Sequence, residues 1–135
     1  MSDKAFFDTN VILYLISNDE MRVQKTESLL LQGGVVSVQN LNECANISLR
    51  KLGRSWMEIQ DLLFFVRTVC TVVPVTTETH ERGLLLAERY RLSVYDGMIW
   101  AAAILSNCTV LYSEDMQHGL KIGNTLLHNP FLEEF

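Results

Sequence analysis

The chain has 135 residues, of which 48% are hydrophobic and 20% are charged, which suits one folded domain with a single hydrophobic core and argues against a disordered chain. Its net charge of −5 lacks the basic excess of most nucleic-acid-binding proteins, but carboxylates that hold cations would account for part of that charge, so charge excludes neither class. No apolar run reaches the ~20 residues of a membrane span, and the N-terminus lacks the basic and apolar regions of a signal peptide, so we expect a soluble cytoplasmic protein.

Short apolar runs alternate with longer amphipathic segments along the chain. The apolar runs predict strands at residues 4–7, 35–38, 71–75 and 109–112, with a fifth at 125–127. Cap residues and helical spacing predict helices at residues 11–16, 19–32, 39–52, 78–90 and 93–105, and one that begins at the capping box Ser55–Glu58. This order predicts one domain over residues 1–135, a three-layer α/β/α sandwich with a mostly parallel central sheet of four to five strands.

Four acidic residues stand where predicted strands end or predicted helices begin. Asp8 directly follows the first strand, and Asp115 follows the fourth. Glu43 and Asp96 lie in the first turns of two later helices. Ligands of parallel α/β sheets bind beyond the carboxyl ends of the strands, so we expect the four carboxylates to share one edge of the sheet.

Each of these acids also suits a purely structural role. Asp96 can complete a capping box with Ser93, and Glu43 can do the same with Asn40. The other two acids can be a helix cap and an ordinary loop residue.

Taken together, the four carboxylates indicate a cation site. On one edge they would repel one another, which raises carboxyl pKa values and costs stability unless a cation offsets the charge. Oxygen ligands suit Mg²⁺ or Mn²⁺, and the three cysteines and three histidines are too scattered for a zinc site. Two such ions can clamp the attacking and leaving oxygens of a phosphodiester displacement.

The same positions carry a family resemblance that spans the chain. It rests on FFDTNVIL at residues 6–13, NEC at 42–44, YDGMIWAAA at 95–103, YSEDMQHG at 112–119 and the closing HNPF at 128–131. These motifs resemble the PIN domain, and most closely its bacterial VapC-type toxins. The resemblance implies a Mg²⁺- or Mn²⁺-dependent endoribonuclease that cleaves RNA, forms a homodimer and is held in check by a small antitoxin. The catalytic and metal-binding residues that it implies are Asp8, Glu43, Asp96 and Asp115.

Within that set, we expect Asp8 and Asp96 to hold the most tightly bound ion, since each is fixed by an ordered element. Glu43 would complete that shell or orient the attacking water, and Asp115 would hold a second ion or a ligand water. The residues that we expect to orient these carboxylates are Thr9, Asn10, Ser113 and Glu114. Their alternative role is as caps and turn formers.

Two positions depart from the family pattern. Gly97 replaces the alanine that is common after the helix-opening aspartate, which affects no catalytic group. Glu114 adds an acid beside Asp115 and leaves the fourth ligand open between the two.

Several further residues are candidates for contacts with RNA or a second subunit. The basic residues that could grip an RNA backbone, or form a solvated face, are Arg50, Lys51 and Arg54. His118 could reach a phosphate or be a surface turn residue. Two apolar segments, residues 62–66 and 84–87, form the expected dimer surface.

Three alternatives to an endoribonuclease remain. A phosphatase of the haloacid dehalogenase type also begins with a strand that ends in aspartate, but it needs a second aspartate where this chain has Asn10, and a loop lysine, for which Lys121 is a weak candidate. A PIN-like nuclease that acts on DNA is also open, since carboxylates do not read the 2′-OH. The third is a binding module that has lost the metal, against which the presence of all four acids speaks.

Overall fold

A six-stranded sheet runs through the computed structural model, which describes residues 4–132. The strands are β1 (Ala5–Phe7), β2 (Gly34–Ser37), β3 (Cys70–Val73), β4 (Val110–Tyr112), β5 (Lys121–Ile122) and β6 (Thr125–His128). Their order in the sheet is β3-β2-β1-β4-β6-β5, and every neighbouring pair is parallel except β5 and β6. The first strand of the chain therefore lies in the middle of the sheet.

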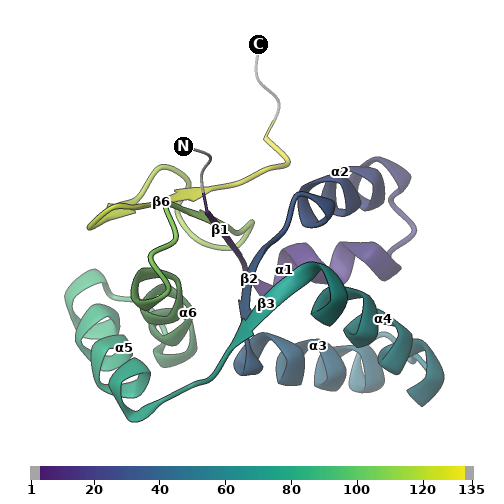
Figure 1. The fold of residues 1–135 in the computed structure, drawn as a ribbon, viewed down its shortest axis with the longest axis horizontal. Helices are drawn as coiled ribbons and strands as arrows, with labels where there is room; N and C mark the ends of the chain where they lie inside the picture. The colour runs from purple at the N-terminus through teal and green to yellow at the C-terminus, as the bar shows by residue number, and fades with distance from the viewer. Residues whose placement is uncertain (1–3, 133–135) are drawn as a thin grey trace.

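Helices cover both faces of this sheet (Figure 1). They are α1 (Thr9–Ile12), the 3₁₀ helix η1 (Leu13–Ile16), α2 (Glu20–Leu31), α3 (Val38–Arg50), α4 (Trp56–Val69), α5 (Thr77–Tyr90) and α6 (Val94–Leu105). Helices α5 and α6 lie on one side of the strands, and α1 to α4 lie on the other. Within residues 4–132, none of these helices is both long and apolar enough to cross a membrane.

Alternating side chains along the central strands explain the two layers of core. Phe6 and Val35 pack in the cluster that includes the buried residues of α6, whereas Phe7 and Val36 pack in the cluster that includes α1 and α4. Successive residues of a strand point to opposite faces of the sheet, so a fully apolar strand needs helices on both sides. The predicted three-layer α/β/α sandwich is confirmed.

The strand ends differ from the prediction in small ways. The sheet has six strands, because Lys121–Ile122 forms a two-residue strand that pairs antiparallel with β6. A strand of two residues has no periodic pattern to recognise. The predicted second strand also runs one residue too far, since Val38 begins α3.

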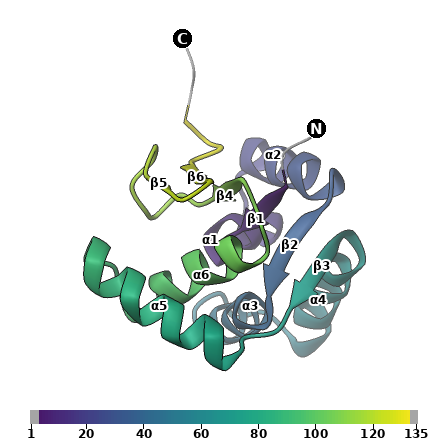
Figure 2. The same ribbon diagram turned by 60° about the vertical axis from the view of Figure 1, so that its left-hand side comes forward.

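The two segments of the expected dimer surface lie on different helices, α4 and α5. Helices α4 and α5 lie on opposite sides of α3 in both ribbon views (Figures 1 and 2). Within these segments, Leu62, Val66, Leu86 and Ala87 are buried in the two cores, whereas Phe64, Leu84 and Leu85 are exposed. Only the exposed residues are available to a second copy, and a sequence alone does not separate core positions from contact positions.

Two glycines let α5 and α6 cross closely (Figure 2). A Cβ atom on Gly97 would lie 2.4 Å from the carbonyl oxygen of Gly83, and one on Gly83 would lie 2.6 Å from the sulfur of Met98. A side chain at position 97 would require a shift of backbone, whereas one at position 83 would displace the Met98 side chain and crowd its backbone at 3.1 Å. The glycine that departs from the family pattern at position 97 is therefore a packing residue.

Candidate active site

Asp8 is the most buried of the four acids. It directly follows β1 and caps α1, and it is only 5% exposed. Its Oδ1 accepts a bond from the Thr9 amide at 2.8 Å, and its Oδ2 accepts bonds from Ser113 Oγ at 2.9 Å and Asn10 Nδ2 at 3.3 Å. Ser113 reaches Asp8 because β1 and β4 are parallel neighbours, with Phe7 opposite Tyr112. Asp8 and Ser113 lie together because each directly follows one of two parallel neighbouring strands, whose carboxyl ends meet at the same edge of the sheet.

Glu43 is joined to the same group through Thr9. The Thr9 hydroxyl donates to Glu43 Oε1 at 2.7 Å and accepts a bond from Asn40 Nδ2 at 3.1 Å. On its other oxygen, Glu43 accepts a bond from Gln39 Nε2 at 3.2 Å. Three of the residues expected to orient carboxylates, Thr9, Asn10 and Ser113, therefore contact them directly. The contact of Gln39 was not predicted from the sequence.

The capping role considered for Glu43 is wrong. Ser37 is the N-cap of α3, and its backbone amide donates to Asn40 Oδ1 at 2.8 Å, so Asn40 itself completes the capping box. Because the helix begins at Val38, Glu43 lies in its second turn and not its first. The Glu43 carboxylate therefore takes no part in capping α3.

Asp96 lies in the first turn of α6, as expected. Its backbone amide donates to the Ser93 hydroxyl at 3.0 Å, so Ser93 caps the helix. The reciprocal bond of a capping box, from the Ser93 amide to the Asp96 carboxylate, does not form among the described residues. The carboxylate is partly buried, and Asp96 does not complete a capping box.

The charges of the acids act on one another across four separate elements. Burial raises the pKa of Asp8 to about 7, against bonds from Ser113 and Thr9 that lower it, and the charges of Asp96 and Glu43 raise it further. The repulsion expected from the sequence is thus present, but burial is the larger cause.

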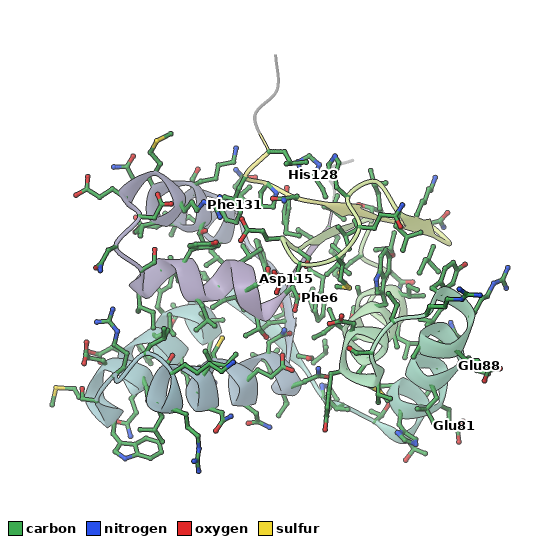
Figure 3. The ribbon with its side chains drawn as sticks, turned by 180° about the vertical axis from the view of Figure 1, so that it is seen from behind. Phe6, Glu81, Glu88, Asp115, His128 and Phe131 are labelled. Carbon is green, nitrogen blue, oxygen red and sulfur yellow. The ribbon has the colours of Figure 1, made fainter. Side chains whose placement is uncertain are left out.

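The pKa of Asp96 is also raised. Burial raises it, the Ser93 hydroxyl lowers it, and the charges of Asp115 and Glu43 raise it. Asp115 itself is exposed in the loop after β4. Figure 3 shows it near the middle of the molecule, beside the N-terminal helices.

The acids do not form a closed metal cage. Among residues 4–132, no three histidine, cysteine or acidic side chains lie close enough together to hold a metal ion. The donors are nevertheless all oxygen atoms, partly desolvated and of like charge, which is the chemistry that a hard divalent cation satisfies. The chemistry of the donor set therefore fits Mg²⁺ or Mn²⁺.

Glu114 is engaged elsewhere. Its carboxylate accepts bonds from the Tyr14 hydroxyl and from the Arg22 guanidinium, and its backbone amide donates to Asn10 Oδ1 at 3.0 Å. The Arg22 guanidinium also lies 4.9 Å from the ring centres of both Tyr14 and Phe131. We call these residues the Arg22 clamp, and it fixes the loop that carries the acids after β4.

A groove leads from Asp115 to basic side chains that directly follow α3. Its volume is about 640 Å³, and the residues lining it include Asn10, Tyr14, Lys51, Arg54 and Asp115. We call it the Lys51 groove. Lys51 is exposed and has no ion-pair partner among the described residues, whereas Arg54 pairs with Glu58 at 3.2 Å. Arg50 does not line this groove.

His118 contacts the closing segment of the chain. Its Nδ1 accepts a bond from the Asn129 amide at 3.0 Å, and its ring centre lies 5.1 Å from that of His128. His118 is therefore a residue of a surface turn that contacts the closing segment, which was the second of the two roles expected for it.

Comparison with known proteins gives a family and a set of similar folds. The sequence matches the PIN domain over residues 5–119. Comparison with curated protein sequences gives no significant match.

Among solved structures, a toxin–antitoxin complex from Klebsiella pneumoniae is similar with a TM-score of 0.73 and 20% identity, over 95% of this chain and 98% of that one. VapC20 of Mycobacterium tuberculosis, described as a toxin that cleaves the sarcin–ricin loop, gives a TM-score of 0.68 and 19% identity, over 83% and 90% of the two chains. VapBC2 of Rickettsia felis, bound to a DNA fragment from its promoter, gives a TM-score of 0.66 and 19% identity, over 93% of this chain and 97% of that one.

Proposed function

Because this chain belongs to the PIN domain family, we propose that it is a Mg²⁺- or Mn²⁺-dependent endoribonuclease and the toxin of a toxin–antitoxin pair. The observation that carries the proposal is the electrostatic coupling of Asp8, Glu43, Asp96 and Asp115, which come from four separate elements. Such coupling costs stability without a cation, so a divalent ion is the natural partner of the group.

The residues take the following roles in this proposal. Asp8 and Asp96 hold the ion, and Glu43 completes its surroundings or orients the attacking water. When bound, the ion supplies charge neutralisation and a water of lowered pKa. Thr9, Asn10 and Ser113 hold the oxygens of the acids in place before substrate binds, which reduces the reorganisation that catalysis would otherwise require.

We assign the fourth acidic position to Asp115 and not to Glu114. The Glu114 carboxylate is already neutralised by Arg22, whereas Asp115 has no hydrogen bond or ion pair among the described residues. The charge of Asp115 also raises the pKa of Asp96, and Glu114 is not among the groups that shift this pKa. Glu114 is in this view a positioning residue that anchors the loop through the Arg22 clamp.

The Lys51 groove suits the RNA backbone. It connects Asp115 with Lys51, whose ammonium is unpaired and therefore available to a phosphate oxygen. A path of this kind offsets the net charge of −5 locally, where the strand approaches the acids.

The partners that we propose are a small antitoxin and a second copy of the chain, in the cytoplasm. The Klebsiella and Rickettsia structures are described as toxin–antitoxin assemblies, which supports the first. The phosphatase alternative is not supported, because the amide of Asn10 carries no acidic proton and Lys121 lies on the edge strand β5.

The test is cleavage of RNA by the purified protein with Mn²⁺, with and without excess EDTA. Cleavage should stop in EDTA, and Asp8→Asn and Asp96→Asn should each lose most of the rate while they stay folded. Asp61→Asn, which removes an exposed carboxylate of α4, should cleave normally. Single-stranded DNA of the same sequence is the substrate control. Cleavage unchanged in EDTA would refute the metal-dependent mechanism.

A further inference from the structure

A second hollow opens beside the acids and differs in chemistry from the Lys51 groove. Its volume is about 580 Å³, and its walls come from the starts of α3 and α6, from α5 and from the segment before α5. The residues that give it its character are Val38, Val75, Val94, Tyr95, His80 and Asn42. The three valines and Tyr95 are all exposed, and Tyr95 is 68% exposed. We call it the Tyr95 hollow.

The Tyr95 hollow lies directly beside two of the acids, Glu43 and Asp96. Glu43 is one of its lining residues, and Tyr95 precedes Asp96 in α6. The Gln39 amide donates both to Glu43 Oε2 and to the Tyr95 carbonyl, each at 3.2 Å. A ligand in this hollow therefore lies next to Glu43 and close to Asp96.

The lining chemistry selects a flat and uncharged ligand. Apart from the His80 imidazole, none of the described residues that line the hollow is basic, so it has little to offer a phosphate. Exposed valines and an aromatic ring next to side-chain amides match the needs of a nucleobase, which stacks through its faces and forms hydrogen bonds through its edge. Asn42 is exposed, and its amide can both donate to and accept from a base.

We propose that the Tyr95 hollow binds one base of the RNA strand beside the bond that is cut, with the base stacked on Tyr95 and its edge facing Asn42. The Lys51 groove then takes the backbone while the Tyr95 hollow takes the base, so the acids lie between a phosphate site and a base site. This inference rests on the proposed function for the identity of the polymer, but binding of a base is measurable without any cleavage. It makes Tyr95 and Asn42 the residues that set sequence preference.

The first experiment uses nucleosides, which lack phosphate and need no metal. Adenosine, guanosine, cytidine and uridine are titrated at millimolar concentrations into the ¹⁵N-labelled full chain in EDTA. At least one nucleoside should shift amide signals around Asn42, Val75 and Tyr95 and leave those of α4 unchanged. Shifts outside the hollow, or none with any nucleoside, would overturn the proposal.

The second experiment compares variants in a short single-stranded RNA binding assay in EDTA. Tyr95→Ala should weaken binding about 5- to 150-fold, which is the range for loss of one stacked base, whereas Tyr95→Phe keeps the ring and should bind as the unchanged protein does. Phe64→Ala is the matched control, because Phe64 is an aromatic residue of α4 that is 74% exposed and lies outside the hollow. Equal loss in Tyr95→Ala and Phe64→Ala, or none in either, would count against the base site.

Cleavage of a randomised RNA pool separates this inference from the proposed function. With Mn²⁺, Asn42→Ala should alter the base preferred beside the cut, while the unchanged protein shows one dominant preference. If nucleosides bind but no RNA is cut, the base site stands and the endoribonuclease proposal fails. If RNA is cut with the same preference by Tyr95→Ala and Asn42→Ala, the base site fails and the nuclease stands. A hollow already covered by a second copy, seen as signals that reappear at Asn42 and Tyr95 only on dilution, would also overturn the base site.

Discussion

Replacing the Asp8 carboxylate by an amide should stabilise the metal-free protein at high pH and not at low pH. Burial raises the pKa of Asp8 from 3.8 to about 7 in the folded chain. The folded state therefore binds more protons than the unfolded state between about pH 4 and pH 7, and the free energy of unfolding falls as pH rises through that window. Asp8→Asn does not titrate, so it escapes that fall.

The size of the effect follows from two opposing contributions. A rise in pKa from 3.8 to about 7 corresponds to ~4 kcal/mol against the ionised form, as an upper bound. The amide keeps an oxygen for the Thr9 amide but turns a nitrogen toward the donors Ser113 and Asn10, which costs ~1–3 kcal/mol. Asp8→Asn should thus gain ~1–3 kcal/mol above about pH 8 and be equal or less stable near pH 5.

Denaturant unfolding in EDTA across that pH range measures the difference. Asp61→Asn serves as the matched control, since it removes an exposed carboxylate and should change the free energy of unfolding by less than ~0.5 kcal/mol at every pH. A constant offset between Asp8→Asn and the unchanged protein from pH 5 to pH 8 would show that Asp8 does not carry the burial penalty, and the reasoning would be wrong.

Three further predictions concern the metal, the helix crossing and the Arg22 clamp. Mn²⁺ should raise the melting temperature of the unchanged protein by mass action and that of Asp8→Asn much less; equal rises in calorimetry would place the metal elsewhere. Gly97→Ala should cost ~1–3 kcal/mol in denaturant unfolding, because the new methyl group meets the Gly83 carbonyl, and an unchanged midpoint would mean that α5 and α6 can separate freely. Arg22→Met should slow RNA cleavage and lower stability by leaving the Glu114 charge unpaired, and adding Glu114→Gln should recover part of both; single and double variants that behave alike would refute the coupling.

Local patterns in the sequence were sufficient for much of the fold. The capping box of α4 is confirmed, because Ser55 and Glu58 are three residues apart and exchange bonds within one turn. The position of Asp8 beside Ser113 also follows from a general rule, since both come directly after strands that turn out to be parallel neighbours.

Contacts that depend on tertiary packing could not be predicted. Glu114 is bonded to Tyr14 and Arg22 across 100 and 92 residues of sequence, and nothing in the local composition links them. The burial of Asp8, which dominates its pKa, likewise depends on helices that come from other parts of the chain. Sequence patterns therefore identified the acids but not the environment that sets their chemistry.

The central place of β1 has a consequence for synthesis of the protein. Its neighbours in the sheet are β2 and β4, and the bond between Asp8 and Ser113 spans 105 residues. At translation rates of ~5–20 residues per second, Asp8 waits about 5 to 20 s before Ser113 has been added to the chain. Until then, β1 lacks one of its two partners, and Asp115 in the loop after β4 has not been made. The proposed nuclease would therefore stay inactive for most of its own translation, and the nascent chain could not cut the message from which it is being read.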